Sequence, residues 1–152
     1  MAIHLRASMV INQPIQEVWS YVVNEANAPI WRRPYVKHVT RVGAGPTAVG
    51  TRFQGVMSSG GTYVTEITHY EPPVRMSWAF VSYPAGPMKG REGSYLLAAE
   101  GPGTRVTLDE TSDAVGLLGT ALSFPTSVLL TAVIGPRLLK QLQAGIEGRT
   151  TA

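Results

Sequence analysis

The stretch AVGLLGTALSFPTSVLLTAVIGP, residues 114–136, decides the fold, because it holds no charged residue between Asp113 and Arg137. The chain then becomes amphipathic in PRLLKQLQAGIEG, residues 136–148, where apolar side chains recur at helical spacing at Leu138, Leu139, Leu142 and Ile146. Proline is tolerated in the first turn of a helix, so Pro125 predicts the helix start and Glu147 lies near its end. Such a helix is roughly 34 Å long at 1.5 Å per residue.

The uncharged stretch also has the length of a membrane span, since about 20 apolar residues cross a bilayer. Its glycines, serines and threonines, with Pro125 in the middle, argue against a span. The upstream strands also need this apolar surface to form a core. We therefore predict a helix gripped by a curved sheet with a ligand cavity between them; a plain core helix without a cavity is the simpler alternative.

Length and composition are typical of one domain over residues 1–152, with a sizeable core and only 15% charged residues. The absence of cysteine excludes disulfides, thiolate metal sites and thiol catalysis. The first residues, MAIHLRAS, lack the basic and apolar regions of a signal peptide, so we expect a cytoplasmic protein.

The segments before residue 114 alternate between apolar and polar residues, which is typical of half-buried strands. The first strand covers Ile3 to Ile11, a helix follows Pro14, and a second helical turn covers Ala28 to Arg32. Further strands are predicted near residues 36–42, 51–57, 63–70, 74–80, 94–99 and 105–111, with a Pro- and Gly-rich loop over 83–93. The predicted fold is α+β, with a seven-stranded curved antiparallel sheet wrapped around the C-terminal helix and two short helices after strand 1.

Five segments carry a resemblance to a known family: ASMVINQPIQEVWSYV (7–22), APIWRRPYVKHV (28–39), VGTRF (49–53), EPPVRMSW (71–78) and GPGTRVTL (101–108). In this order the chain resembles the START-like helix-grip superfamily (SRPBCC), and within it the polyketide cyclase/dehydrase and lipid-transport family. The resemblance implies a helix-grip fold and a protein that binds, carries or cyclises hydrophobic molecules. A shared fold does not choose among these activities.

Catalytic motifs are few. The three histidines lack metal-binding spacing, no GxSxG elbow is present, and the glycines of residues 43–50 do not match a phosphate-binding loop, so we predict no metal and no cofactor. The candidate catalytic residues are Tyr63, His69 and Glu110. Glu110 shares the alternation of Val106 and Leu108, so it is expected to point inward unless the strand bulges or ends there.

The predicted ligand-binding residues are apolar or aromatic side chains on faces expected to point inward: Trp31, Tyr35, Phe53, Met57, Tyr63, Met76, Trp78, Tyr95, Leu129 and Val133. For each of them the alternative is that it packs the core. A register error of one residue on any strand would exchange the candidates of that strand.

The net charge of 13 − 10 = +3 is local, because five cations lie between Glu25 and Glu66 without an acid: Arg32, Arg33, Lys37, Arg41 and Arg52. This basic patch (residues 32–52) is either the solvated face of a strand or a contact for an acidic ligand or membrane surface. Nucleic acid is not an expected partner, since the patch lacks interleaved aromatics. The oligomeric state is open, and a dimer is compatible with the sequence.

Three functions follow from these observations. The leading one is a carrier or sensor of a lipid or polycyclic metabolite. The second is a polyketide cyclase or dehydratase that moves protons with pocket Tyr, His or Glu groups. The third is an interaction or membrane-surface protein that uses the basic patch.

Overall fold

A computed structural model describes residues 2–83 and 88–151 of the chain. The helices are α1 (Ile15–Val22), the 3₁₀ turn η1 (Glu25–Asn27), α2 (Ala28–Trp31), α3 (Gly116–Leu129), the π-helical turn η2 (Leu130–Ile134) and α4 (Gly135–Thr151). The strands are β1 (Ala2–Ile11), β2 (Val36–Val42), β3 (Arg52–Met57), β4 (Thr62–Glu71), β5 (Arg75–Ser82), β6 (Met88–Glu100) and β7 (Gly103–Ala114).

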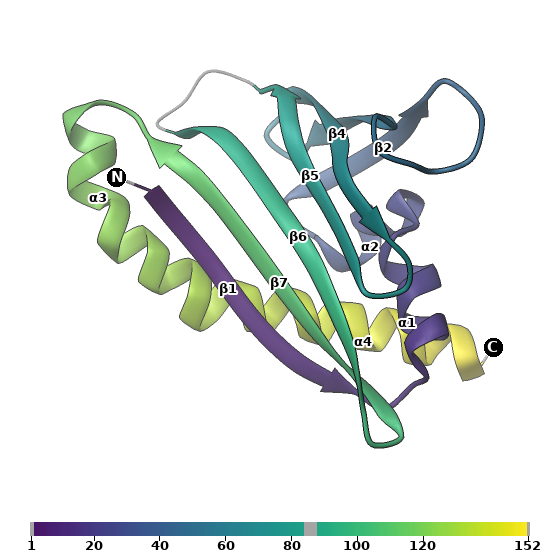
Figure 1. The fold of residues 1–152 in the computed structure, drawn as a ribbon. Coiled ribbons are helices and arrows are strands. Elements are labelled where there is room, and N and C mark those ends of the chain that lie inside the picture. The colour runs from purple at the N-terminus through teal and green to yellow at the C-terminus, as the bar shows by residue number, and fades with distance from the viewer. Residues whose placement is uncertain (1, 84–87, 152) are drawn as a thin grey trace.

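The described strands form one seven-stranded sheet in the order β1-β7-β6-β5-β4-β3-β2, with every neighbouring pair antiparallel. The sheet curves around the C-terminal helix, and α1 and α2 close one end (Figure 1). The predicted helix-grip fold is therefore confirmed. The predicted loop over 83–93 was too long, because β6 already begins at Met88; residues 84–87 of that loop lie outside the described part of the chain.

The inward face of the sheet follows the alternation in the sequence. In β1 the side chains of Ile3, Leu5 and Ala7 are buried while the intervening ones are exposed. In β7 Val106 and Leu108 are fully buried on the same face. Period-two alternation thus sets which residues meet the helix, as expected for a sheet with one covered side.

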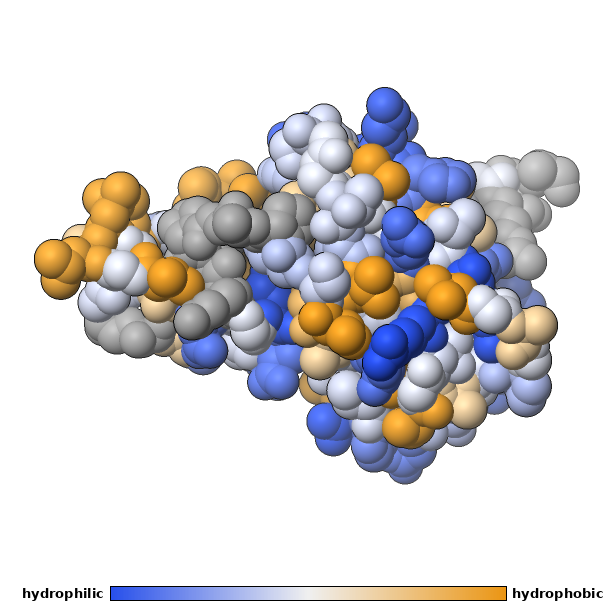
Figure 2. Space-filling view, turned by 90° about the horizontal axis from the view of Figure 1, so that it is seen from above, coloured by the Kyte–Doolittle hydropathy of each residue, from blue (hydrophilic) through white to orange (hydrophobic). Residues whose placement is uncertain are grey.

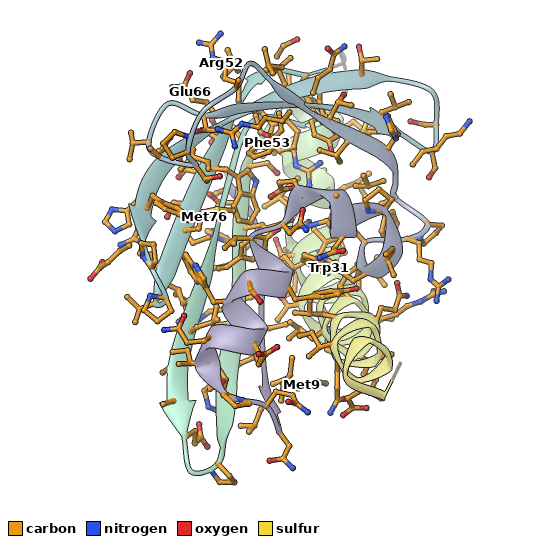
Figure 3. The ribbon with its side chains drawn as sticks, turned by 90° about the vertical axis from the view of Figure 1, so that its right-hand side faces the viewer. Met9, Trp31, Arg52, Phe53, Glu66 and Met76 are labelled. Atoms are coloured by element: carbon orange, nitrogen blue, oxygen red, sulfur yellow. The ribbon has the colours of Figure 1, made fainter. Side chains whose placement is uncertain are left out.

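The C-terminal helix completes the core through α4. Leu138, Leu139, Leu142 and Ile146 are almost wholly buried, which confirms the predicted amphipathic face. They pack with Val18 and Trp19 of α1 and with Trp31, the last residue of α2, which lies beside α4 (Figure 3). The Gln141 amide, turned so that its nitrogen faces α2, donates to the carbonyls of Trp31 (3.0 Å) and Arg33 (2.9 Å).

The predicted helix start at Pro125 was wrong, since α3 begins at Gly116 and continues through this proline. Proline removes the hydrogen bond to the carbonyl four residues earlier, at Ala121. Both residues are exposed, so water can satisfy that carbonyl and the helix tolerates the loss.

The same helix lies along the edge strand β1 (Figure 1). Ser127 Oγ accepts from the His4 amide at 3.0 Å, and Thr131 Oγ1 accepts from the Arg6 amide at 3.3 Å. A Cβ on Gly135 would lie 2.7 Å from the Cβ of Ala7, so this glycine permits the close approach. By length and composition alone the helix Gly116–Gly148 could cross a membrane, but its α4 portion is built into the core of this domain.

Candidate ligand-binding site

A cavity of about 410 Å³ lies between the concave face of the sheet and the C-terminal helix. All seven strands contribute to its walls, together with the segment from Glu25 to Tyr35 and the helical residues Leu130, Ile134 and Leu138. The volume falls within the range of about 300–1,000 Å³ that is typical of small-molecule sites. The prediction of a cavity rather than a plain core helix therefore agrees with the structure.

At the polar end of the cavity the guanidinium group of Arg32 lies among aromatic rings. Trp78 and Tyr95 are tilted against each other with ring centroids 4.5 Å apart. The guanidinium carbon of Arg32 lies 4.6 Å from the ring centroid of Trp31 and 5.4 Å from that of Trp78. Arg32 Nη2 also donates to the Tyr95 hydroxyl at 3.0 Å. Arg32 directly follows α2. Its side chain points into the cavity beside Trp31, which is buried in the core.

Glu110 is the acid that balances this cation. Its Oε1 lies 2.7 Å from Arg32 Nη1, and its Oε2 lies 3.7 Å from Arg91 Nη2. The Arg32 and Glu110 side chains are only 15% and 14% exposed. The Arg32 contact is an ion pair rather than an aligned hydrogen bond, because Oε1 accepts no well-directed N–H from the described residues. One carboxylate thus shares two guanidinium groups in a largely buried place.

The guanidinium group of Arg91 stacks on a second set of aromatic rings in the same way. Its guanidinium carbon lies 5.1 Å from the Phe80 ring centroid, and Nη1 donates to the Tyr83 hydroxyl at 3.2 Å. Phe80 packs in turn against Tyr63, with centroids 5.1 Å apart. The wall therefore repeats one unit twice: an arginine held by Glu110 and stacked on aromatic rings.

Two glycines make room for these rings. A Cβ on Gly93 would lie 2.4 Å from the Trp78 indole, and a Cβ on Gly55 would lie 2.1 Å from the Tyr63 ring. Both glycines sit on neighbouring strands, directly across from the aromatic residue. Without a side chain there, each ring can lie flat against the sheet, which leaves the centre of the cavity open.

Glu25, at the start of η1, is a cavity carboxyl whose pKa is moved into the neutral range. Burial raises its pKa from 4.5 to about 7, and the attraction of Arg32 opposes that rise only in part. A carboxyl group with this pKa is present in both protonation states near neutral pH. It can therefore accept or give a proton inside the cavity.

Four other groups of the cavity are held in one protonation state at neutral pH: Tyr63, Tyr95, Arg32 and Glu110. Burial raises the pKa of Tyr63 to about 12 and raises that of Tyr95 further, so both are phenols at neutral pH. Burial favours neutral forms of Arg32 and Glu110, but their mutual attraction prevails over this effect on the pKa of each and keeps both charged. Among these groups the cavity near neutral pH thus offers the Arg32 cation, the Glu110 anion, the phenols of Tyr63 and Tyr95, and the Glu25 carboxyl that titrates.

Six predicted site residues line the cavity: Tyr35, Met57, Tyr63, Trp78, Tyr95 and Glu110. Glu110 points inward as its alternation with Leu108 indicated. Phe53, Met76 and Trp31 are buried in the hydrophobic core instead, and they support the wall without forming it (Figure 3).

Three predicted positions were wrong. Leu129 and Val133 are 51% and 56% exposed, because the helix turns its other side, with Leu130 and Ile134, to the cavity. His69 follows a bulge in β4 that breaks the alternation of Tyr63, Thr65 and Ile67. Its ring is exposed and contacts Glu71 at 3.2 Å, away from the cavity wall.

The basic patch predicted over residues 32–52 is not one surface. Arg32 points into the cavity, and Arg52 pairs with Glu66 at 2.7 Å on the outer side of the sheet (Figure 3). Arg41 donates to the Pro46 carbonyl in the adjoining loop. The side chains of Arg33 and Lys37 are exposed. Because Arg32 and Arg52 lie on different sides of the sheet and Arg32, Arg41 and Arg52 are already engaged, the five cations do not act as one positively charged surface.

Sequence reasoning missed Glu25, Arg91, Phe80 and Tyr83, and it placed Arg32 on the surface. Phe80 had a usable signal, since it continues the alternation of Met76 and Trp78. The charged residues had none, because charge is ordinarily a mark of the surface.

Comparison with known proteins agrees with this architecture. The family described as polyketide cyclase/dehydrase and lipid transport matches residues 2–144. No curated protein matches the chain. Similar solved structures include the di-domain ARO/CYC StfQ from the steffimycin biosynthetic pathway, with TM-score 0.77, 13% identity, and coverage of 100% of this chain and 53% of StfQ. The chain thus spans about half the length of that protein.

Two further structures have the same fold. TTHA0849 from Thermus thermophilus has TM-score 0.74 and 22% identity, with 96% of this chain and 98% of that one covered. The di-domain ARO/CYC BexL from the BE-7585A biosynthetic pathway has TM-score 0.69 and 19% identity, with 94% and 49% covered. At these identities the solved structures establish the fold, and the family match over residues 2–144 establishes family membership. The chain belongs to the polyketide cyclase/dehydrase and lipid-transport family.

Proposed function

We propose that this protein binds a hydrophobic small molecule that carries polar oxygen groups, and that it acts as a carrier or sensor of that molecule. The observation that supports this most is the cavity of about 410 Å³, with aromatic walls and the Arg32–Glu110–Arg91 group at its polar end. Flat rings and methionine favour an apolar or aromatic body. The two guanidinium groups and the phenols of Tyr63 and Tyr95 favour carbonyl, phenolate or carboxylate oxygens on the ligand.

The first test is native mass spectrometry of the purified protein, followed by identification of any molecule released on denaturation. Binding is then measured with 1,8-dihydroxyanthraquinone and oleic acid as probes. Val39→Trp places an indole on a half-buried cavity position of β2, and Val42→Trp makes the same change at an exposed position of that strand. We expect Val39→Trp to abolish binding and Val42→Trp to retain it. Equal binding by both variants would show that the ligand does not occupy this cavity.

A cyclase or dehydratase is the second candidate, and one specific observation favours it. Glu25, with a pKa of about 7, lies in the same cavity as the phenol of Tyr63, so a proton acceptor and a proton donor face the same space. If the protein is an enzyme, the variants Glu25→Gln and Tyr63→Phe should still bind the molecule but should lose turnover. If it is a carrier, the wild type should show no turnover, and binding should respond mainly to changes in the shape of the cavity.

A further inference from the structure

The helix α3 has its polar and apolar sides reversed relative to the usual surface helix. Its side toward the protein carries the buried Gly119 and Ser123 and then Ser127, and η2 continues that side with Thr131; the hydroxyls of Ser127 and Thr131 contact the backbone of β1. Its side toward solvent is apolar. We define the outer stripe as the exposed side chains Leu117, Leu118, Leu122, Phe124, Val128, Leu129 and Val133.

The outer stripe is large for a surface that stays in water. Leu117 is 93% exposed and Phe124 is 75% exposed, and the remaining members are about half exposed or more. The hydrophobic residues gather over this end of the molecule, at the left of Figure 2. Together they expose on the order of 700 Å² of apolar surface, against about 300–600 Å² for the largest patch of a typical monomer. A surface of this kind marks an interface.

We propose that the outer stripe is covered by a second copy of this chain, in a two-fold symmetric dimer that pairs α3 with α3. Two such stripes bury on the order of 1,400 Å², which lies within the roughly 1,200–2,000 Å² of a stable protein interface. A two-fold interface must be complementary to itself. The stripe meets that requirement, because it contains no charge to place beside its own copy.

A membrane surface fits the stripe less well. Helices that lie in a membrane interface carry Lys and Arg along a polar face beside the apolar one. No cation occurs between Asp113 and Arg137, and the polar side chains of this segment are uncharged hydroxyls, of which Ser127 and Thr131 contact β1. Arg6, on the adjacent strand, is already paired with Asp109 at 2.5 Å. Of the described residues on α3 and on β1 beside it, none therefore offers a free cation to an anionic bilayer.

The test is sedimentation velocity of the full chain over a series of protein concentrations. The variant Leu118→Glu/Leu122→Glu puts charge on the stripe, and glutamate is a good helix former, so α3 itself is retained. Val42→Glu/Val49→Glu is the matched control, since both valines are at least half exposed and lie outside the stripe. We expect a dimer for the wild type and the control, and a monomer for the stripe variant with an unchanged circular dichroism spectrum.

Three results would overturn the proposal. One is a monomeric wild type throughout the concentration series, and another is a stripe variant that remains dimeric. The third is a monomer that floats with phosphatidylcholine/phosphatidylglycerol vesicles only when the stripe is intact, which would assign the stripe to a membrane. The proposal is independent of the ligand, because Val39→Trp alters the cavity and leaves the stripe untouched.

Discussion

The ion pair between Arg32 and Glu110 should couple strongly in a double-mutant cycle. The changes are Arg32→Met, which keeps an apolar stem beside Trp31 and Trp78, and Glu110→Gln, which keeps the shape of the side chain. In the folded protein the two groups are 2.7 Å apart and about one-seventh exposed. Removing either one leaves a charged group in a largely buried site without its main partner.

The magnitude follows from this geometry. Two unit charges about 4 Å apart interact by about 4 kcal/mol at an effective dielectric of about 20. Arg91, at 3.7 Å from the second Glu110 oxygen, still pairs with that carboxylate in Arg32→Met and reduces the loss there, whereas in Glu110→Gln both arginines lose their acid. We therefore expect Arg32→Met to lower the free energy of unfolding by about 3 kcal/mol and Glu110→Gln to lower it by at least as much, with a coupling energy of about 2 kcal/mol.

The assay is urea unfolding followed by tryptophan fluorescence at pH 7 and in acid. Because the folded-state pKa of Glu110 is lowered, its stabilising effect is present above the unfolded pKa and is lost as pH falls through the folded value. The deficit of Arg32→Met should therefore shrink in acid. The exposed pair Arg105–Glu100, at 2.6 Å, is the control and should show little coupling. A coupling energy for Arg32 and Glu110 below about 0.5 kcal/mol would refute the reasoning.

Two further variants test the site. Gly93→Ala should lower the free energy of unfolding by about 1–3 kcal/mol and weaken ligand binding, because the new Cβ would collide with the Trp78 ring. Gly148→Ala is the control, since its Cβ would meet open space, and it should change neither quantity. Urea unfolding and titration with the probes measure both effects. Glu25→Gln should remove a pH dependence. The raised pKa of Glu25 means that its contribution is complete below about pH 4.5 and is lost as pH rises through about 7, so the wild type should lose about 3 kcal/mol that the variant retains. An identical pH profile of unfolding for the two proteins would contradict this assignment.

Much of the scaffold could be predicted because alternation and helical spacing are local properties. The inward parity of Glu110 followed from Val106 and Leu108, and the buried face of α4 followed from the spacing of Leu138 to Ile146. The same reasoning failed at His69, where a bulge in β4 shifts the register between Ile67 and the next paired residue. An inserted residue leaves no mark in the composition of the strand.

Charge was the poorest guide to the site. Arg32 stands in a run of cations and reads as a surface residue, yet Glu110, 78 positions later, holds it inside the cavity. A buried cation requires a partner of opposite charge, and here β7 supplies that partner from a distant part of the sequence. Glu25 owes its raised pKa to burial under the same assembly, which its neighbours in sequence do not indicate.

The sequence by itself determined that a long apolar helix ends the chain and that one face of the preceding strands is buried. Only the tertiary structure decided which side of that helix faces inward between Gly116 and Ile134. The physical reason is that this segment carries no charge on any side, so its sequence does not distinguish a side that must face water from a side that must be buried. Its serine and threonine hydroxyls turn toward the unpaired edge of β1, where backbone groups need partners, and Leu129 and Val133 are left facing solvent.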